Sequence, residues 1–267
     1  MSPRSAICLL GLFAALAGGC DTLRARHRAQ LGAELYKKGD FQNALYKYEQ
    51  AAALDPGIDA LHLNLGFVYL QLFNASPKST TGATYGGLAV RSFQEYHRRR
   101  PDDPRARSYL VQTFVDTRRY DDAVAFFKPE VEAAKPSIEA ISTLGQIAAR
   151  VGKIQDALTW YEKRVEITPT DPDAHYNLGV LVWDLLHNHL EIIADARLNL
   201  ANRGLQALNK AIELRPHSPD GYTYLNLVYR ERATGQPDDL LKAADIAEAD
   251  KYMKQALELM KQGGAKK

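Results

Sequence analysis

Few side chains in this 267-residue sequence have the type and spacing needed for chemistry, and the most reactive of them is a thiol near the N-terminus. Cys20 follows an apolar run, residues 7–17, and a pair of glycines, after which the sequence becomes polar. The other cysteine, Cys8, lies inside the apolar run, so the chain beyond Cys20 has no thiol with which to form a disulfide. An unpaired cysteine in this position is a candidate for covalent modification.

The apolar run is eleven residues long, the length of a signal-peptide core, whereas a membrane-spanning helix needs about 20 residues. Together with the small residues before Cys20, the run resembles a bacterial lipoprotein signal. The resemblance implies a signal peptide over residues 1–19, cleavage after Gly19 and attachment of acyl chains such as palmitate to Cys20. Residues 20–28 would then form a lipidated linker that anchors the protein to a membrane of the cell envelope, facing the periplasm.

The signal departs from that family at one position. Leucine is usual three residues before the cysteine, but this chain has Ala17 there and Leu16 one position earlier. Residues 15–17 also fit the A-x-A pattern of ordinary signal-peptidase cleavage. Cleavage after Ala17 would release a soluble periplasmic protein, and this alternative stays open. The anchored form is compatible with either the inner or the outer membrane.

Signatures of metal binding and catalysis were sought throughout the sequence. His187 and His189 are two residues apart and therefore do not share a helix face, and no carboxylate or cysteine stands at ligand spacing. There is no nucleophile elbow, H-E-x-x-H, Walker A or glycine-rich dinucleotide turn. We therefore expect no metal, no cofactor and no catalytic residue, with an envelope hydrolase of unrecognised type as the less favoured alternative.

The charges predict no nucleic-acid partner. Lys and Arg number 34 against 32 Asp and Glu, a net charge of +2, so no global field would attract an anionic polymer. The basic string His97–Arg100, followed by Arg105 and Arg107, is interpreted as a cationic helix end that offsets the helix dipole. Asp102 and Asp103 stand beside it to neutralise it.

The sequence repeats itself. Residues 31–56 and 144–169 share a Leu-Gly pair, a later glycine, an alanine, a tyrosine and a closing proline at nearly equal offsets. A small residue recurs along the chain with steps of 45, 34, 34, 47 and 45. The positions are Ala44, Ala89, Ala123, Ala157, Gly204 and Ala249. Two steps equal 34, and the other three exceed it by 11, 13 and 11 residues.

These positions resemble those of the tetratricopeptide repeat, a pair of helices, A and B, in which small residues allow close packing and large ones fill the space beside them. The resemblance implies an all-α, right-handed α-solenoid of about six hairpins over residues 29–261, with insertions in the second, fifth and sixth. Stacking buries the surface that one hairpin cannot bury alone. Residues 74–87 are predicted to be a polar inserted loop, and residues 262–267 a disordered tail.

Local signals mark the helix ends. Asp103-Pro104, Asp171-Pro172 and Ser218-Pro219 each place a capping side chain before a proline at the first helical position. Pro129 is expected to kink or shorten its helix. The sixth repeat has Asn226 at the glycine position and Met253 at the aromatic position, which predicts a terminal hairpin that caps the stack.

In the tetratricopeptide family a concave groove is lined mainly by one face of helix A. Trp183 and Tyr176 are the preferred contact residues, because exposed aromatic side chains dominate interface energies. The alternative, that Trp183 packs under the insertion of its own repeat, stays open. The predicted groove residues are Tyr36, Leu63, Phe67, Gln112, Gln146, Tyr176 and Trp183.

The resemblance and the signal together predict a membrane-anchored scaffold or adaptor of the bacterial envelope. Its groove would bind a peptide or helix of another envelope protein, for example in pilus, secretion or envelope assembly. A soluble periplasmic module that binds peptides or small ligands is the alternative. The sequence sets no oligomeric state.

Overall fold

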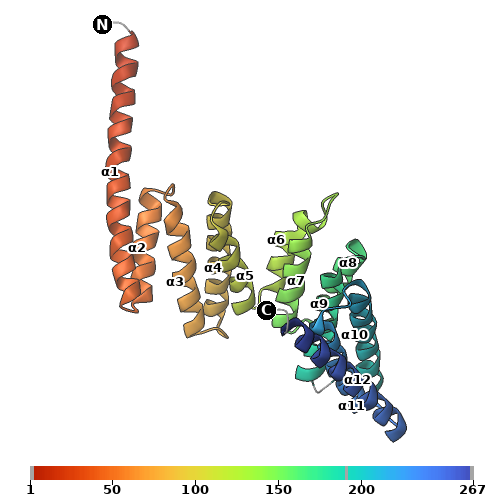
Figure 1. Ribbon diagram of the computed structural model, residues 1–267. Coiled ribbons are helices and arrows are strands. Elements are labelled where there is room, and N and C mark those ends of the chain that lie inside the picture. Colours follow the sequence, from red (N-terminus) through yellow and green to blue (C-terminus); the bar gives the residue numbers. More distant parts are fainter. Residues whose placement is uncertain (1–2, 190–191, 265–267) are drawn as a thin grey trace. The chain divides into compact units, whose positions relative to one another are not determined.

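The computed structural model describes residues 3–189 and 192–264, and within these ranges every regular element is a helix (Figure 1). In chain order the helices are α1 (Pro3–Lys37), α2 (Phe41–Leu54), α3 (Asp59–Ala75), α4 (Thr80–Arg99), α5 (Pro104–Asp116), α6 (Tyr120–Val131), α7 (Ile138–Arg150), α8 (Ile154–Ile167), α9 (Pro172–Asn188), α10 (Ala194–Leu214), α11 (Pro219–Gly235) and α12 (Asp239–Gly264).

In chain order these helices alternate as helix A and helix B, and we number the consecutive pairs as hairpins 1 to 6. The chain divides into two compact units, residues 1–122 and 123–267, with the boundary inside α6. Within the units, the two helices of hairpins 1, 2, 4, 5 and 6 pack together, and α2, α4, α8 and α10 each pack against the helix A that follows. Each unit is thus a stack of helical hairpins, which confirms the all-α, α-solenoid class.

Close approach of helix A to helix B explains the repeated small and large residues. A Cβ atom on Gly145 of α7 would lie 2.6 Å from Cε2 of Tyr161 on α8, closer than real contacts allow. Gly66 and Phe93 show the same relation in hairpin 2, at 2.7 Å. The ring of helix B therefore rests on bare backbone of helix A, as predicted.

The prediction of an inserted loop at residues 74–87 was wrong. Helix α4 begins at Thr80, where the Ser79 hydroxyl accepts a hydrogen bond from the Gly82 amide at 2.9 Å. The glycines that suggested a loop are buried inside the helix, and a Cβ on Gly86 would lie 3.2 Å from the Phe73 ring. The insertion therefore lengthens the two helices of hairpin 2.

The insertions of hairpins 5 and 6 also lengthen the helices of those hairpins. Helices α3, α9 and α11 have 17 residues each, against 13 for α5 and α7. Helices α4, α10 and α12 have 20, 21 and 26 residues, against 14 for α8. The four residues added to each of the A helices α3, α9 and α11 make about one turn at 3.6 residues per turn, so the apolar face of helix A stays in register.

Most of the predicted helix ends are confirmed. Helices α5, α9 and α11 begin at the three prolines, and the carboxylates of Asp103 and Asp171 each accept a backbone hydrogen bond at 2.9 Å. Ser218 occupies the N-cap position without a side-chain cap bond. Helix α6, which contains Pro129, ends two residues later and has 12 residues.

Residues 20–28, for which the sequence predicted a lipidated linker, are helical and continue α1 into hairpin 1. Ala25 is fully buried there, and the Thr22 hydroxyl donates a 2.8 Å hydrogen bond to Asp55. At the other end, α12 includes residues 262–264, which were predicted as tail, whereas 265–267 lie outside the described residues. Among the described residues, no helix has a stretch long and apolar enough to cross a lipid bilayer.

The contact of Gly145 with Tyr161 gives a direct test of the packing. We expect Gly145→Ala to lower the free energy of unfolding by about 1–3 kcal/mol, because the ring has to move away. Gly87→Ala is the matched control, since a Cβ there would lie 3.5 Å from the Arg119 guanidinium, an ordinary contact. Alanine's helix preference should leave the control unchanged or more stable by up to about 1 kcal/mol. Urea denaturation followed by circular dichroism measures both, and equal stability of the two variants would contradict the packing.

Candidate functional site

The predicted groove residues divide between the two units. Gln146, Tyr176 and Trp183 lie in the unit formed by residues 123–267, on the A helices of hairpins 4 and 5. The others lie in the unit formed by residues 1–122 and are Tyr36, Leu63, Phe67 and Gln112.

A cavity of about 440 Å³ opens on the helix A side of hairpins 4, 5 and 6. It combines Gln146, Ala149 and Arg150 of α7 with Trp183 of α9 and with Tyr224 of α11. The wall is completed by Tyr161, Asn177, Val180, Leu181 and Asp184. The structure thus brings two predicted residues, Gln146 and Trp183, to one site.

Tyr224 was missed by the sequence analysis, and it joins the two predicted aromatic residues. Its ring meets Tyr176 edge to face at a centroid distance of 5.5 Å and Trp183 in the same way at 5.4 Å. Tyr176 itself lines a separate cavity of about 140 Å³ beside the N-terminal ends of α9 and α11. Burial, with Tyr224 nearby, raises the pKa of Tyr176 to about 12, so its hydroxyl is neutral at physiological pH.

Trp183 is half-buried. It has features of both predicted roles, a contact residue of the groove and a side chain packed under the insertion of its own repeat. One face of the indole stacks on His187, one turn further along α9, at 5.2 Å and an interplanar angle of 19°. His187 belongs to the lengthened part of the helix, so the insertion does cover one side of Trp183. The ring nevertheless lines the cavity, where it is available for contact.

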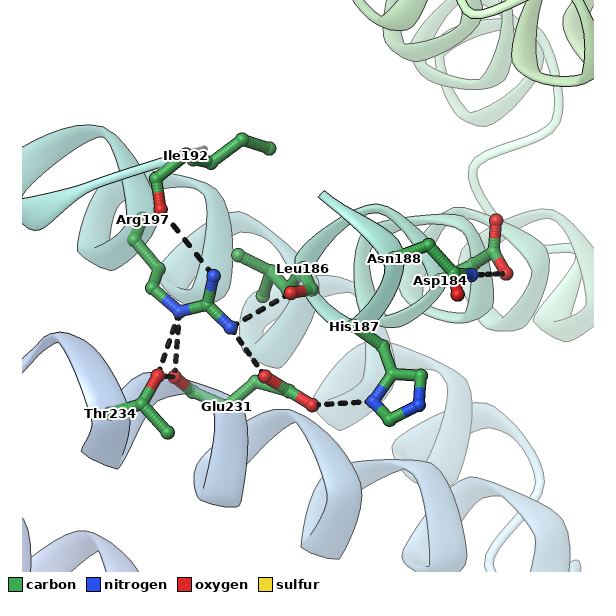
Figure 2. Close-up of polar contacts among 8 residues, drawn as sticks. All are labelled: Asp184, Leu186, His187, Asn188, Ile192, Arg197, Glu231 and Thr234. Carbon is green, nitrogen blue, oxygen red and sulfur yellow. Dashed lines mark hydrogen bonds and ion pairs between the residues drawn. The ribbon is translucent and has the colours of Figure 1, made fainter. Parts of the chain in front are cut away.

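A buried arginine organises the lengthened ends of hairpins 5 and 6 (Figure 2). Arg197 of α10 is 6% exposed. Its Nη2 donates to the Leu186 carbonyl at 2.8 Å and to a carboxylate oxygen of Glu231 at 2.5 Å. Its Nε donates to the Thr234 hydroxyl at 2.8 Å, and its Nη1 to the Ile192 carbonyl at 3.4 Å. One guanidinium therefore connects α9, α10 and α11.

Glu231 continues this network to the aromatic residues. Its second carboxylate oxygen lies 2.9 Å from Nδ1 of His187 (Figure 2). The His187 ring in turn stacks on Trp183. The orientation of Trp183 is thus linked through His187 and Glu231 to the buried guanidinium of Arg197. His187 and Glu231 are 44 residues apart in sequence, so no local signal could have paired them.

The predicted residues of the other unit have mainly packing contacts. Phe67 lies between Phe93 and Tyr109, with centroid distances of 5.2 and 5.1 Å. The Tyr36 ring meets Phe41 edge to face at 5.3 Å, and Leu63 is half-buried.

Gln112 is exposed and donates a 2.5 Å hydrogen bond to Asp116. None of these four predicted residues belongs to the cavity that contains Trp183.

The basic string at the end of α4 is neutralised locally, as predicted. Arg98 and Arg99 both donate to Glu95 at 2.6 Å, which lowers the pKa of Glu95 to about 2. Arg100 pairs with Asp102 at 3.2 Å. Arg105 likewise pairs with Asp103, at 3.1 Å.

Among the described residues, no three His, Cys, Asp or Glu side chains come together in a group that could hold a metal ion. In the lengthened hairpins, the half-buried Glu231 is paired with Arg197 and the buried Asp245 with Arg232, so each carboxylate is engaged by an arginine and not by a second carboxylate. Cys20 is exposed on α1.

The link from Glu231 to Trp183 predicts two effects of Glu231→Ala in a Trp160→Phe background, where Trp183 is the remaining tryptophan. The free energy of unfolding should fall by about 3 kcal/mol, because a buried guanidinium loses its carboxylate. Trp183 fluorescence should shift to longer wavelength, because His187 is released from the ring. Glu166→Ala, at an exposed position on α8, is the control. An unchanged emission spectrum would contradict the link.

Models of known protein families match three regions of the chain. The family model described as TPR repeat matches residues 32–72 and 145–185, and the model described as tetratricopeptide repeat matches residues 87–137. The matched region 145–185 contains α8, the C-terminal part of α7 and most of α9, the helices that supply most of the cavity.

Individual known proteins are also similar to this chain, at low sequence identity. Protein FlbA of Caulobacter vibrioides is 24% identical over 149 residues, 56% of this chain, and the match spans 23% of FlbA. The structure of MamA, residues 41 to the end, from Desulfovibrio magneticus RS-1 is 17% identical, with a TM-score of 0.42, over 74% of this chain and 96% of that one. YrrB, described as a TPR protein with an unusual peptide-binding site, is 21% identical, with a TM-score of 0.35, over 73% and 88%.

Proposed function

We propose that this chain, which contains tetratricopeptide repeats, is a scaffold that binds a peptide or helix of another protein in the cavity formed by hairpins 4, 5 and 6. The observation that carries the proposal is the convergence of Trp183, Tyr224 and Gln146 on one cavity from three consecutive A helices. Stacking of hairpins presents such A helices side by side as a binding surface.

The composition of the cavity supports a polypeptide as its ligand. The aromatic rings offer a large contact area at low entropic cost, and such residues dominate binding energies. The amides of Gln146 and Asn177 can exchange hydrogen bonds with a peptide backbone. The lining therefore has the mixture of apolar surface and a few polar groups that is typical of binding sites. Gly145 and Tyr161, which stand at repeat positions, pack against each other inside hairpin 4.

Site-specific cross-linking tests this proposal. A photoreactive residue in place of exposed Gln146 should capture a defined protein in cells, and Trp183→Ala should weaken that complex by about 2 kcal/mol, the loss typical of an interface hot spot. The matched control carries the photoreactive residue at Glu166, on α8. Capture of the same proteins from both positions, or capture that is insensitive to Trp183→Ala, would contradict binding in the cavity.

We further propose that lipid on Cys20 anchors the scaffold to a membrane of the cell envelope, where its partners would be envelope proteins. The signal-like run before Cys20 and the exposure of that residue support the proposal. Each buried methylene of an acyl chain contributes about 0.8 kcal/mol, so several chains give stable anchoring. Because Thr22 and Ala25 pack into hairpin 1, the anchor would hold that hairpin close to the lipid headgroups.

The intact mass of the mature protein tests the anchor. We expect a chain that begins at Cys20 and carries the added mass of acyl chains, and we expect Cys20→Ser to abolish both the modification and membrane fractionation. Cys8→Ser is the control, since its thiol would be removed with the signal peptide. A mature chain that begins with unmodified Gly18 would establish the soluble alternative instead.

A further inference from the structure

Hairpin 1 begins almost at the residue that would carry the lipid. In a mature chain that starts at Cys20, only Asp21 precedes Thr22, whose hydroxyl donates a 2.8 Å hydrogen bond to Asp55. Ala25 follows on the next turn and is fully buried. At 1.5 Å per residue in a helix, Cys20 lies about 3 Å along α1 from Thr22. No flexible linker therefore separates the lipidated residue from the packed helices.

The loop between α2 and α3 lies at the same end of hairpin 1. Asp55 joins this loop to α1, because one of its carboxylate oxygens accepts from Thr22 and the other from the Gly57 amide, at 2.9 Å. At the start of α3, Asp59 lies 3.5 Å from the Arg99 guanidinium at the end of α4. These helix ends form one edge of the unit, and α1 leaves the unit there (Figure 1). We call it the N-terminal edge, and it consists of residues 20–24, 54–60 and 97–100.

The N-terminal edge exposes apolar side chains beside the lipidated residue. Leu23 is 68% exposed and stands three residues after Cys20, so the two side chains share a helix face. Leu54, the last residue of α2, is 36% exposed. In the part of this unit that the structure describes, the large apolar side chains that are exposed are Leu23, Tyr46 and Leu54. Two of these three thus lie at the edge to which acyl chains would be attached.

The charges of the N-terminal edge do not select its occupant. Arg24 pairs with Asp21 at 3.4 Å, Arg99 pairs with Asp59, and the rest of the basic string at the end of α4 is neutralised as described above. Paired charges can stay hydrated among lipid headgroups, a layer of about 5–8 Å on each side of the hydrocarbon core. Arg26, exposed on the next turn of α1, would add attraction to anionic lipid. The tether length and the two leucines, and not charge, therefore point to lipid.

We propose that the N-terminal edge lies within the headgroup layer of the membrane, where Leu23 and Leu54 contact lipid, and that the missing linker between Cys20 and hairpin 1 holds it there. The proposal rests on the lipid anchor proposed above. It adds a fixed orientation, in which helices α1 to α4 have this edge at the bilayer and their opposite ends directed away from it.

Fluorescence quenching in vesicles tests this orientation. In the lipidated chain Cys20 has no free thiol and Cys8 is lost with the signal peptide, so one introduced cysteine can be labelled. Ala60→Cys and Ala75→Cys form a matched pair, since both alanines are exposed and lie at opposite ends of α3. The labelled chains are reconstituted in phosphatidylcholine vesicles that contain a lipid with a nitroxide on its headgroup. The label at Ala60 should be quenched at least three-fold more strongly than the label at Ala75, about 22 Å further along the helix.

A linker variant tests the cause of the orientation. A flexible run of about ten glycine and serine residues inserted between Asp21 and Thr22 should leave the acyl mass and the vesicle binding unchanged. It should lower the quenching at Ala60 to the level at Ala75. Equal quenching at the two positions without the insertion, or quenching at Ala60 that survives the insertion, would overturn the orientation while the acyl mass still supports the anchor. A mature chain without acyl chains would overturn the anchor and the orientation together.

Discussion

The fold depends on one contact that recurs in the hairpins, the packing of an aromatic ring of helix B against bare backbone of helix A. Gly32 lies against Tyr48, Gly66 against Phe93 and Gly145 against Tyr161, and an added Cβ would come within 3 Å of the ring in every case. This contact fixes the distance between the two helices, and hence the direction in which the remaining face of helix A points. Gln146 can line a cavity because Gly145, directly before it, sets α7 against Tyr161. For Trp183 the same role belongs to Gly179, four residues before it, which packs against Leu208 in place of a ring.

Hairpin 6 shows what happens when this contact is changed. Asn226 replaces the glycine, is fully buried, and donates a 2.8 Å hydrogen bond from its side chain to the Ala249 carbonyl. Met253, at the position of the ring, is 36% exposed. At this position a hydrogen bond to the backbone thus replaces the contact between glycine and ring. The flexible methionine contributes to an outer surface that a rigid, inward-facing ring would not supply.

The sequence predicted what depends on local spacing and failed where distant residues decide. The repeat, the prolines at the starts of α5, α9 and α11, and the meeting of Gln146 with Trp183 follow from periodicity and capping chemistry. Residues 74–87 were read as a loop because serine, threonine and glycine favour turns, but burial against Phe73 made those glycines helical. Tyr224 stands at a position of helix A that was not among the predicted groove positions, and His187 and Glu231 are 44 residues apart with no repeated pattern that links them, so neither contact was predicted.

The lengthened hairpins bury their additional turns by two different means, and the difference bears on specificity. Hairpin 2 stands beside a hairpin with a helix B of 14 residues, and its added turns pack on each other, with Tyr69 stacked on Tyr85 at 6.1 Å and Phe73 against Gly86. Hairpins 5 and 6 are adjacent, and their added turns meet through Arg197 and Glu231. A buried ion pair adds little net stability, yet breaking it is costly, so it selects one arrangement of its neighbours. The polar contact therefore fixes hairpin 6 against hairpin 5 and, through His187, fixes Trp183 in the cavity.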